Sequence, residues 1–288
     1  MTLAKHEYMS DVWKDGIFNN KVVFCTGGAG TICSAQVRAM IHLGANACII
    51  GRNVEKTERV AQEMATIRPG AKVIGIGAVD VRKFDDLKAA AERCAKELGS
   101  IDFVIAGAAG NFLASIEQLS INAFKTVMDI DIMGSYNTLK ATLPYLVESG
   151  GNHRVDSETP GTGGRIIFVS ATLHYRGMPF QAHVSVAKAG IDSLSNSGLE
   201  RLLPSDAKAA YLKSQPLGRI GHVRDIADAT VYLFSDSGSY VTGQTLVVDG
   251  SNWRMSGGIS ASDNLRYPDF LLSGQDVPNV TGKKKSKL

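Results

Sequence analysis

The sequence is poor in cysteine, in net charge and in long hydrophobic runs. Its four cysteines, Cys25, Cys33, Cys48 and Cys94, form no CxxC pair and no His/Cys metal spacing, so we expect buried free thiols in a reducing compartment and no metal site. A net charge of only +3 over 288 residues argues against nucleic-acid binding. There is no run of about 18 apolar residues, and the N-terminal stretch has acidic residues and no apolar core, which argues against a membrane span and a signal peptide.

The sequence does contain a regular alternation of short apolar runs and longer amphipathic segments. The apolar runs predict strands at 22–26, 47–50, 73–78, 103–106, 165–169 and 245–248. The amphipathic segments predict helices at 32–43, 54–67, 84–98, within 121–147, at 183–194 and at 224–234. Strands that are apolar throughout are buried on both faces, so we expect the α/β class, with a Rossmann-like, doubly wound parallel sheet covered by helices on both faces.

We predict a single domain at 21–256, preceded by an N-terminal arm at 1–20 and followed by a tail at 257–288. A polar stretch at 150–164 is best explained as a surface insertion. The last residues are Ser286-Lys287-Leu288, which at a free C-terminus form a peroxisomal address read by an import receptor. We therefore expect a protein of the peroxisomal matrix that has the import receptor as a partner.

The glycine-rich run TGGAGTIC, residues 26–33, follows the first predicted strand and precedes the first predicted helix. In a doubly wound sheet this turn holds a pyrophosphate, because unpaired N–H groups and the helix dipole favour negative charge. Small residues let the ligand lie against the backbone. We expect cofactor contacts from Gly27, Gly28, Gly30, Thr31 and Ile32. The glycine spacing departs from the common fingerprint, so a tight turn without a ligand remains the alternative.

The end of the second predicted strand, IIGRN at 49–53, selects between dinucleotides. An acidic side chain there would accept a hydrogen bond from the 2′-hydroxyl of NAD, whereas Arg52 suits the 2′-phosphate of NADP(H). A solvated surface arginine is the alternative. Asp80 and Val81 follow the third predicted strand and are placed to meet the adenine.

Several segments together resemble the short-chain dehydrogenase/reductase family: TGGAG at 26–30, VDVR at 79–82, AGAAGNF at 106–112, AKAG at 187–190 and GQTLVVDG at 243–250. Within that family, GAAGNF at 107–112 and MDIDIMGSYN at 128–137 resemble the 2,4-dienoyl-CoA reductases, most of all the peroxisomal branch. The resemblance implies NADPH-dependent reduction of 2,4-dienoyl-CoA to 3-enoyl-CoA in the β-oxidation of unsaturated fatty acids. It also implies a homodimer or homotetramer packed through the long helices.

The sequence departs from the general family at the residues that carry out proton transfer. Most members have a Tyr-x-x-x-Lys pair, but here Lys188 is preceded four residues earlier by Val184, which cannot transfer a proton. Asp131 stands where the family has an asparagine. The resemblance implies that Lys188 holds the nicotinamide ribose and supports proton supply, and that Asp131 is the acid, directly or through water. A structural carboxylate bonded to backbone is the alternative for Asp131.

The resemblance assigns five further residues. Ser170 matches the family's catalytic serine approximately, and Tyr175 lies where the mitochondrial branch has its acid tyrosine. Arg82 and Arg201 are expected to contact the substrate, an arginine being suited to the phosphates of CoA. Phe112 is expected to line the acyl channel. Each of these side chains has a purely structural role as its alternative.

One departure concerns the length of the chain after Asn196. Compared with the family, about twenty to thirty residues, including a parallel strand, are missing between 196 and 198. No apolar run between 191 and 220 can supply that strand. Because a true deletion would cut through the sheet beside the cofactor, we infer that the sequence omits a segment of the protein.

Two other functions remain open at this point. One is a different peroxisomal reductase of this fold, such as a 2-enoyl-CoA reductase. The other is a catalytically inert NADP-binding protein that acts through its oligomer interfaces. The missing tyrosine favours the inert protein, and its replacement by the Asp131 and Lys188 pair argues against it.

Overall fold

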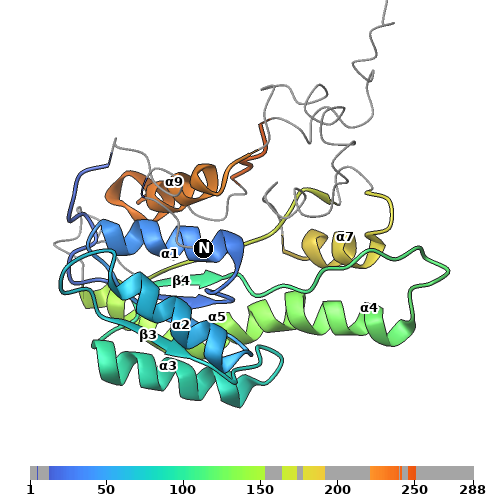
Figure 1. Cartoon of the computed structure of the whole chain (residues 1–288), viewed down its shortest axis with the longest axis horizontal. Coiled ribbons are helices and arrows are strands. Elements are labelled where there is room, and N and C mark those ends of the chain that lie inside the picture. Colours follow the sequence, from blue (N-terminus) through green and yellow to red (C-terminus); the bar gives the residue numbers. More distant parts are fainter. Residues whose placement is uncertain are drawn as a thin grey trace, which may run out of the picture.

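The structure is a computed structural model that describes Lys5 and residues 13–152, 164–173, 178–191, 221–239, 241 and 246–250 (Figure 1). Its centre is a parallel sheet of β1 (Val22–Thr26), β2 (Asn46–Ile50), β3 (Val73–Ile76), β4 (Phe103–Ala106) and β5 (Arg165–Phe168). The strands lie in the order β3-β2-β1-β4-β5. The chain thus builds outward from β1 through β2 to β3 and then continues on the other side of β1, which confirms the doubly wound topology.

Helices cover both faces of the sheet. They are α1 (Thr31–His42), α2 (Val54–Ala65), α3 (Phe84–Leu98), α4 (Ile121–Met128), α5 (Gly134–Asn152), α7 (Ala182–Ala189) and α9 (Val223–Phe234), with a π-helical turn η2 (Asp129–Met133) and a 3₁₀ turn η4 (Asp236–Gly238). In Figure 1, α1 and α9 lie on one side of the sheet and α3 and α5 on the other. The expected α/β fold is therefore confirmed.

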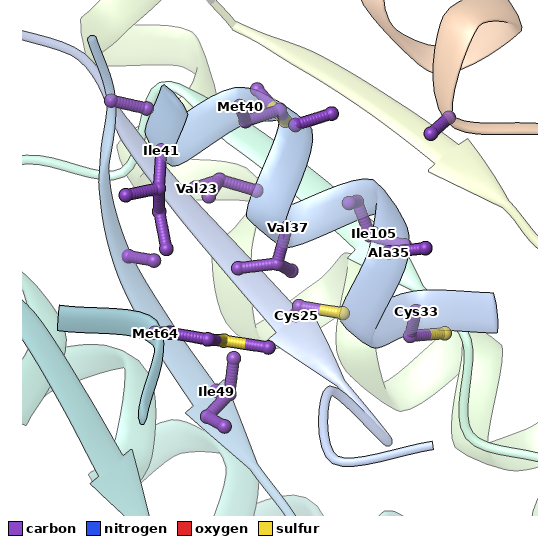
Figure 2. Packing of buried hydrophobic residues seen from close by; sticks show 14 of the residues in the cluster. Val23, Cys25, Cys33, Ala35, Val37, Met40, Ile41, Ile49, Met64 and Ile105 are labelled. Atoms are coloured by element: carbon purple, nitrogen blue, oxygen red, sulfur yellow. The ribbon is translucent and has the colours of Figure 1, made fainter. Parts of the chain in front are cut away.

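Alternate residues of β1 pack into two separate hydrophobic cores, one on each face of the sheet. Val23 and Cys25 of β1 pack with Met40 of α1 and Met64 of α2 on one face (Figure 2). The neighbouring Phe24 packs with residues of α3 and α5 on the other face. Because both faces are covered, every residue of β1 is buried. The four cysteines are free and buried, as expected.

Four elements differ from the sequence prediction. The helix predicted at 183–194 ends at Ala189, and Gly190 and Ile191 are not helical. Strand β3 ends at Ile76 rather than at residue 78, since Ala78 adopts a positive φ of 57°, which a strand does not allow. The long helical region at 121–147 is not one α-helix, because η2 interrupts it. Residues 246–248 do not form the predicted strand.

Several predicted segments lie outside the described residues, namely most of the 150–164 insertion, positions 192–194 of the helix predicted at 183–194, and the tail at 257–288. Within the part of the chain that the structure describes, no helix has the length and apolar character needed to cross a bilayer.

Candidate cofactor and active site

A glycine cradle joins β1 to α1. Gly27 has φ +67°, a backbone conformation that disfavours a side chain. A Cβ on Gly28 would lie 2.6 Å from the Cβ of Ile49, so this turn packs directly against β2. Gly30 is the N-cap of α1 and provides no side-chain cap, and the first turn has no acidic residue. The N-terminal N–H groups of this helix therefore have no competing carboxylate within the first turn and suit an anion.

The cradle opens into a cleft of about 990 Å³ at the carboxyl ends of the strands. Of the residues predicted to bind the cofactor or to act in catalysis, Gly27, Gly30, Thr31, Ile32, Arg52, Asp80, Val81, Ser170 and Lys188 line it. Gly28 lies behind the cradle against Ile49. Since a doubly wound sheet binds its ligand at this edge, where the winding direction reverses, the lining fits a dinucleotide.

Cys33 stands where the common fingerprint has glycine, and its thiol fills a space left by another glycine. The Sγ of Cys33 lies 3.7 Å from the carbonyl oxygen of Gly107 and donates to it. A Cβ on Gly107 would lie only 2.2 Å from that sulfur. The cysteine is therefore accommodated because position 107, directly after β4, has no side chain.

Two cations line the cleft at the end of β2. Arg52 is exposed, and Lys56 lies four residues further along the chain in the first turn of α2. The side chain of Asn53 caps this helix by accepting a hydrogen bond of 2.8 Å from the Lys56 N–H. The sequence analysis missed Lys56, although its distance of four residues from Arg52, across the start of a predicted helix, was a usable signal.

Asp80 and Arg82 form an ion pair beside these cations. Arg82 Nη2 lies 2.5 Å from Asp80 Oδ2, and Arg82 Nε lies 3.0 Å from both carboxylate oxygens. Hydrogen bonds from the Arg82 guanidinium lower the pKa of Asp80 to about 2. Arg82 itself is not among the residues that line the cleft.

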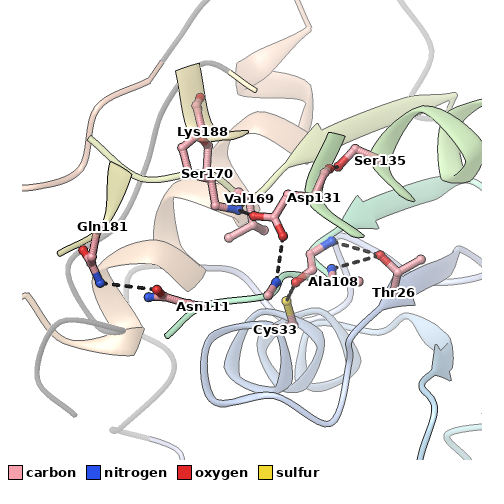
Figure 3. A network of polar contacts seen from close by, with 12 residues as sticks. Thr26, Cys33, Ala108, Asn111, Asp131, Ser135, Val169, Ser170, Gln181 and Lys188 are labelled. Carbon is pink, nitrogen blue, oxygen red and sulfur yellow. Dashed lines mark hydrogen bonds and ion pairs between the residues drawn. The ribbon is translucent and has the colours of Figure 1, made fainter. Parts of the chain in front are cut away.

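Lys188 lines the cleft and forms a buried ion pair with Asp131, which is fully buried behind it and does not itself line the cleft (Figure 3). Lys188 Nζ lies 2.9 Å from Asp131 Oδ2, with side-chain exposures of 7% and 0%. The other carboxylate oxygen, Oδ1, accepts a hydrogen bond of 2.7 Å from the Gly110 N–H. The π turn η2 supplies Asp131 and α7 supplies Lys188, so two segments distant in sequence meet here.

The neighbouring polar groups of this site already have partners. Ser170 Oγ donates to the Lys188 carbonyl oxygen at 3.2 Å. Lys188 Nζ donates to the Val169 carbonyl oxygen at 3.3 Å. Val184 is buried and lines the cleft on the same helix, so the position of the family tyrosine contributes only an apolar surface.

Sequence analysis missed Asn111, Gln181 and His183, which lie around the predicted Phe112, and Phe112 itself is not among the residues that line the cleft. Asn111 lines the cleft, and its Oδ1 accepts a hydrogen bond of 3.3 Å from Gln181 Nε2. Phe112 is 38% exposed and stacks on the fully buried ring of His183, with centroids 4.3 Å apart. Burial lowers the pKa of His183. These residues belong to a loop and to the N-terminal end of a helix. No periodic pattern in the sequence predicts contacts between two such segments.

Tyr175, Arg201 and the terminal Ser286-Lys287-Leu288 lie outside the described residues, as does the position of the inferred missing segment. No cluster of metal-ligating side chains is found among the residues that are described.

The chain matches a family model described as short chain dehydrogenase over residues 21–206, and one described as enoyl-(acyl carrier protein) reductase over residues 199–251. It is 44% identical to the peroxisomal 2,4-dienoyl-CoA reductase SPS19 of Saccharomyces cerevisiae over 90% of this chain and 92% of that protein. It is 33% identical to the peroxisomal 2,4-dienoyl-CoA reductase of Arabidopsis thaliana, over 85% of this chain and 88% of that protein.

Solved structures agree on the fold. A levodione reductase superposes with a TM-score of 0.70 at 20% identity, over 82% of this chain and 99% of that one. A 3-ketoacyl-(acyl-carrier-protein) reductase from Brucella melitensis, complexed with NADH, superposes with a TM-score of 0.67 at 23% identity, over 82% of this chain and 99% of that one. The chain therefore belongs to the short chain dehydrogenase family of oxidoreductases, which use a nicotinamide dinucleotide.

Proposed function

We propose that this protein is an NADPH-dependent 2,4-dienoyl-CoA reductase, which forms 3-enoyl-CoA in the peroxisomal β-oxidation of unsaturated fatty acids. The observation that carries the proposal is the buried pair of Asp131 and Lys188, of which Lys188 lines the cofactor cleft together with Val184. Carbonyl reduction in this family needs a tyrosine at position 184. The names of the relatives from Saccharomyces cerevisiae and Arabidopsis thaliana support the same activity.

The reduction of a dienoyl thioester needs a group that delivers a proton to carbon, rather than the tyrosine that exchanges a proton with an alcohol or ketone oxygen. Bound NADPH supplies the hydride, which adds to C5 of the dienoyl thioester. Negative charge then spreads to the thioester oxygen, and C2 takes up a proton to give the 3-enoyl product. Asp131 is the acid, directly or through water, and Lys188, which lines the cleft and pairs with it, supports the supply of the proton. Ser170 orients Lys188 through its carbonyl, and Tyr175 remains the alternative donor.

The preference for NADPH rests on Arg52 and Lys56. Both line the cleft at the end of β2, where the ribose 2′ substituent is bound in this fold, and two cations there suit a phosphate. Replacing both by alanine should raise KM for NADPH by tenfold or more and leave KM for NADH nearly unchanged, since each lost charged hydrogen bond costs about 1.5–3 kcal/mol. Equal increases for both cofactors would assign the two cations a role other than phosphate binding.

Substrate contacts are proposed for Phe112, Arg82 and Arg201. The partly exposed Phe112 ring supports a wall for the acyl chain. Arg82 is 41% exposed as a side chain and paired with Asp80, so contact with a CoA phosphate would require it to leave or share that pair.

Two partners are proposed besides the substrate. The terminal Ser286-Lys287-Leu288 addresses the chain to the peroxisomal import receptor. A second copy of the chain is proposed to cover the exposed apolar side chains of η2 and α5, namely Met133, Tyr136, Leu143 and Val147. Their spacing of three, seven and four residues puts them on one helix face, which suits a helix-packed dimer or tetramer.

One assay tests the activity against its alternatives. The protein is mixed with NADPH and 2,4-hexadienoyl-CoA, and the absorbances of the cofactor and the diene are followed together. Loss of both at equal rates supports the proposal. Turnover of a 2-enoyl-CoA alone would indicate the other reductase, and NADPH binding without turnover of either thioester would indicate an inert protein.

A matched pair of variants tests the carboxylate. Asp131→Asn should reduce turnover at least a hundredfold, because it removes the buried ionisable group. Asp129→Asn changes a partly exposed carboxylate two residues earlier, which pairs with Lys125 on the helix surface. This control should keep full activity. Full activity of Asp131→Asn would remove that residue from the mechanism.

A further inference from the structure

The four cysteines of this chain form two pairs, one on each face of the sheet. The thiol of Cys25 on β1 contacts that of Cys33 on α1, and the thiol of Cys48 on β2 contacts that of Cys94 on α3. The first pair belongs to the core shown in Figure 2, and the second to the core on the opposite face. All four thiols are free, and the proposed reaction uses none of them.

Of the two pairs, the first reaches the cofactor cleft. Cys33 is 4% exposed and lines the cleft beside the glycine cradle, and its partner Cys25 is fully buried. Cys48 and Cys94 are also fully buried, and neither lines the cleft. A small molecule that enters the cleft therefore meets Cys33 and cannot reach the second pair.

The position of Cys33 brings α1 close to β1. In the common fingerprint this position is a glycine, which allows the helix to pack closely against the strand. Here the thiol fits because Gly107 has no side chain, and its Sγ lies 3.7 Å from the Gly107 carbonyl oxygen. Close packing of this kind favours a disulfide between helix and strand, since the Cα atoms of a disulfide lie only about 5.5–6 Å apart.

The two thiols of this pair differ in reactivity. Burial and the adjacent Cys33 thiol raise the pKa of Cys25 well above its usual value. Because the thiolate is the reactive form, Cys25 is inert toward an oxidant by itself. Cys33 is the member that lines the cleft, so an oxidant reaches it first, and Cys25 is the resolving thiol beside it.

The geometry points to Cys33 and Cys25 as an oxidation site within the cofactor cradle, at which hydrogen peroxide converts the two thiols of the cofactor-free protein into a disulfide. The Cys33 sulfur attacks one peroxide oxygen, the O–O bond breaks, and one water leaves a sulfenic acid on Cys33. The Cys25 sulfur then attacks the Cys33 sulfur, the S–O bond breaks, and the departing oxygen takes up the Cys25 proton as a second water. The two thiols lose two electrons, which reduce one peroxide to two waters.

The disulfide would alter the cradle itself. It draws the Cys33 sulfur away from the Gly107 carbonyl oxygen and shifts the first turn of α1, whose N-cap is Gly30. The N–H groups of this turn are those that suit an anion, so the oxidised protein should bind NADPH more weakly. By linkage, a bound dinucleotide should oppose formation of the disulfide.

The test treats the cofactor-free wild type with hydrogen peroxide and follows its thiols by alkylation and peptide mass spectrometry. Two of the four thiols, those of Cys25 and Cys33, should be lost as one disulfide-linked peptide pair, while Cys48 and Cys94 stay alkylatable. The affinity for NADPH, measured from the fluorescence of the bound cofactor, should fall by about tenfold. Dithiothreitol should restore both the thiols and the affinity, and saturating NADP⁺ should slow the oxidation by about tenfold.

Three variants separate the roles of the thiols. Cys33→Ala should keep Cys25 alkylatable and should bind NADPH equally before and after peroxide. Cys25→Ala should accumulate the Cys33 sulfenic acid, which dimedone traps. The control is Cys94→Ala, which removes one member of the second pair and should form the Cys25–Cys33 disulfide at the wild-type rate.

The wild-type thiol measurement decides the inference without any variant. Cys25 and Cys33 that both stay alkylatable after peroxide would overturn it, as would a Cys48–Cys94 disulfide that forms equally fast. Since the thiol measurement needs neither substrate nor turnover, a protein that fails to reduce 2,4-hexadienoyl-CoA would refute the proposed function and leave this result standing.

Discussion

The ion pair of Asp131 and Lys188 should be the most strongly coupled charge pair among the described residues. At an effective dielectric constant of about 20, two unit charges 2.9 Å apart attract by about 6 kcal/mol. Burying both charges cancels much of this gain. Removing only one partner forfeits the attraction and leaves the other charge buried, so Lys188→Met should lower the free energy of unfolding by about 3–5 kcal/mol.

The double variant Lys188→Met with Asp131→Asn distinguishes the interaction free energy between the two charges from the contribution of each side chain alone. It removes both charges, while the amide oxygen introduced at position 131 can still accept the Gly110 N–H. Its loss of stability should therefore be well below the sum of the two single losses. The free energies come from urea unfolding of the cofactor-free protein, with equal m-values as the check that the same state unfolds.

A double-mutant cycle on an exposed ion pair provides the comparison for the buried pair. Arg93 and Glu97 of α3 form an ion pair of 2.6 Å, with side-chain exposures of 51% and 40%. Arg93→Met and Glu97→Gln should couple by less than about 1 kcal/mol, because solvent screens the pair. If the double variant at Asp131 and Lys188 lost the sum of its two single losses to within about 0.5 kcal/mol, the argument from burial would be refuted.

Three further outcomes are expected. Gly107→Ala should lower the melting temperature, since its Cβ would lie 2.2 Å from the Cys33 sulfur, and adding Cys33→Ala should recover most of the loss; no recovery would place the clash elsewhere. The Asp80 carboxyl should titrate with a pKa of about 2 by NMR, below its usual 3.8, so its pair with Arg82 stabilises the fold above about pH 4 and is lost as the pH falls toward 2; Arg82→Ala should return the midpoint toward 3.8. Intact mass spectrometry should give a mass above 30.7 kDa by several kilodaltons, and a mass of 30.7 kDa would contradict an omitted segment.

The fold was predictable because its signals are local and repeated. Each of β1, β2 and β4 is a short run of mostly buried apolar residues, and each is followed along the chain by a helix. The failures occurred where a backbone detail decides the outcome. The positive φ of Ala78 ends the strand that hydrophobicity alone extends to that residue. Hydrophobic periodicity also cannot distinguish a π turn from continued α-helix over five residues.

The site was predictable where a residue type stands at a position set by the fold. Arg52 at the end of β2 and the glycine cradle after β1 are such cases, and both contribute to the lining of the cleft. The link between Asn111 and Gln181 is a contact between residues 70 positions apart. Side-chain pairing of this kind depends on how a loop and a helix end approach each other, and composition and periodicity contain no record of that distance.

The π turn at 129–133 has a consequence for how this helix can evolve. A π turn equals one residue added to an α-helix, and each α-helical residue turns the chain by about 100°. Deleting one residue there would therefore rotate α4 relative to α5. Asp131 could then no longer point into the protein while Tyr136 and Leu143 point outward. The extra residue of the π turn thus fixes the direction of the buried carboxylate relative to the exposed apolar face. Substitutions can change either feature separately, whereas the loss of one residue would disturb both.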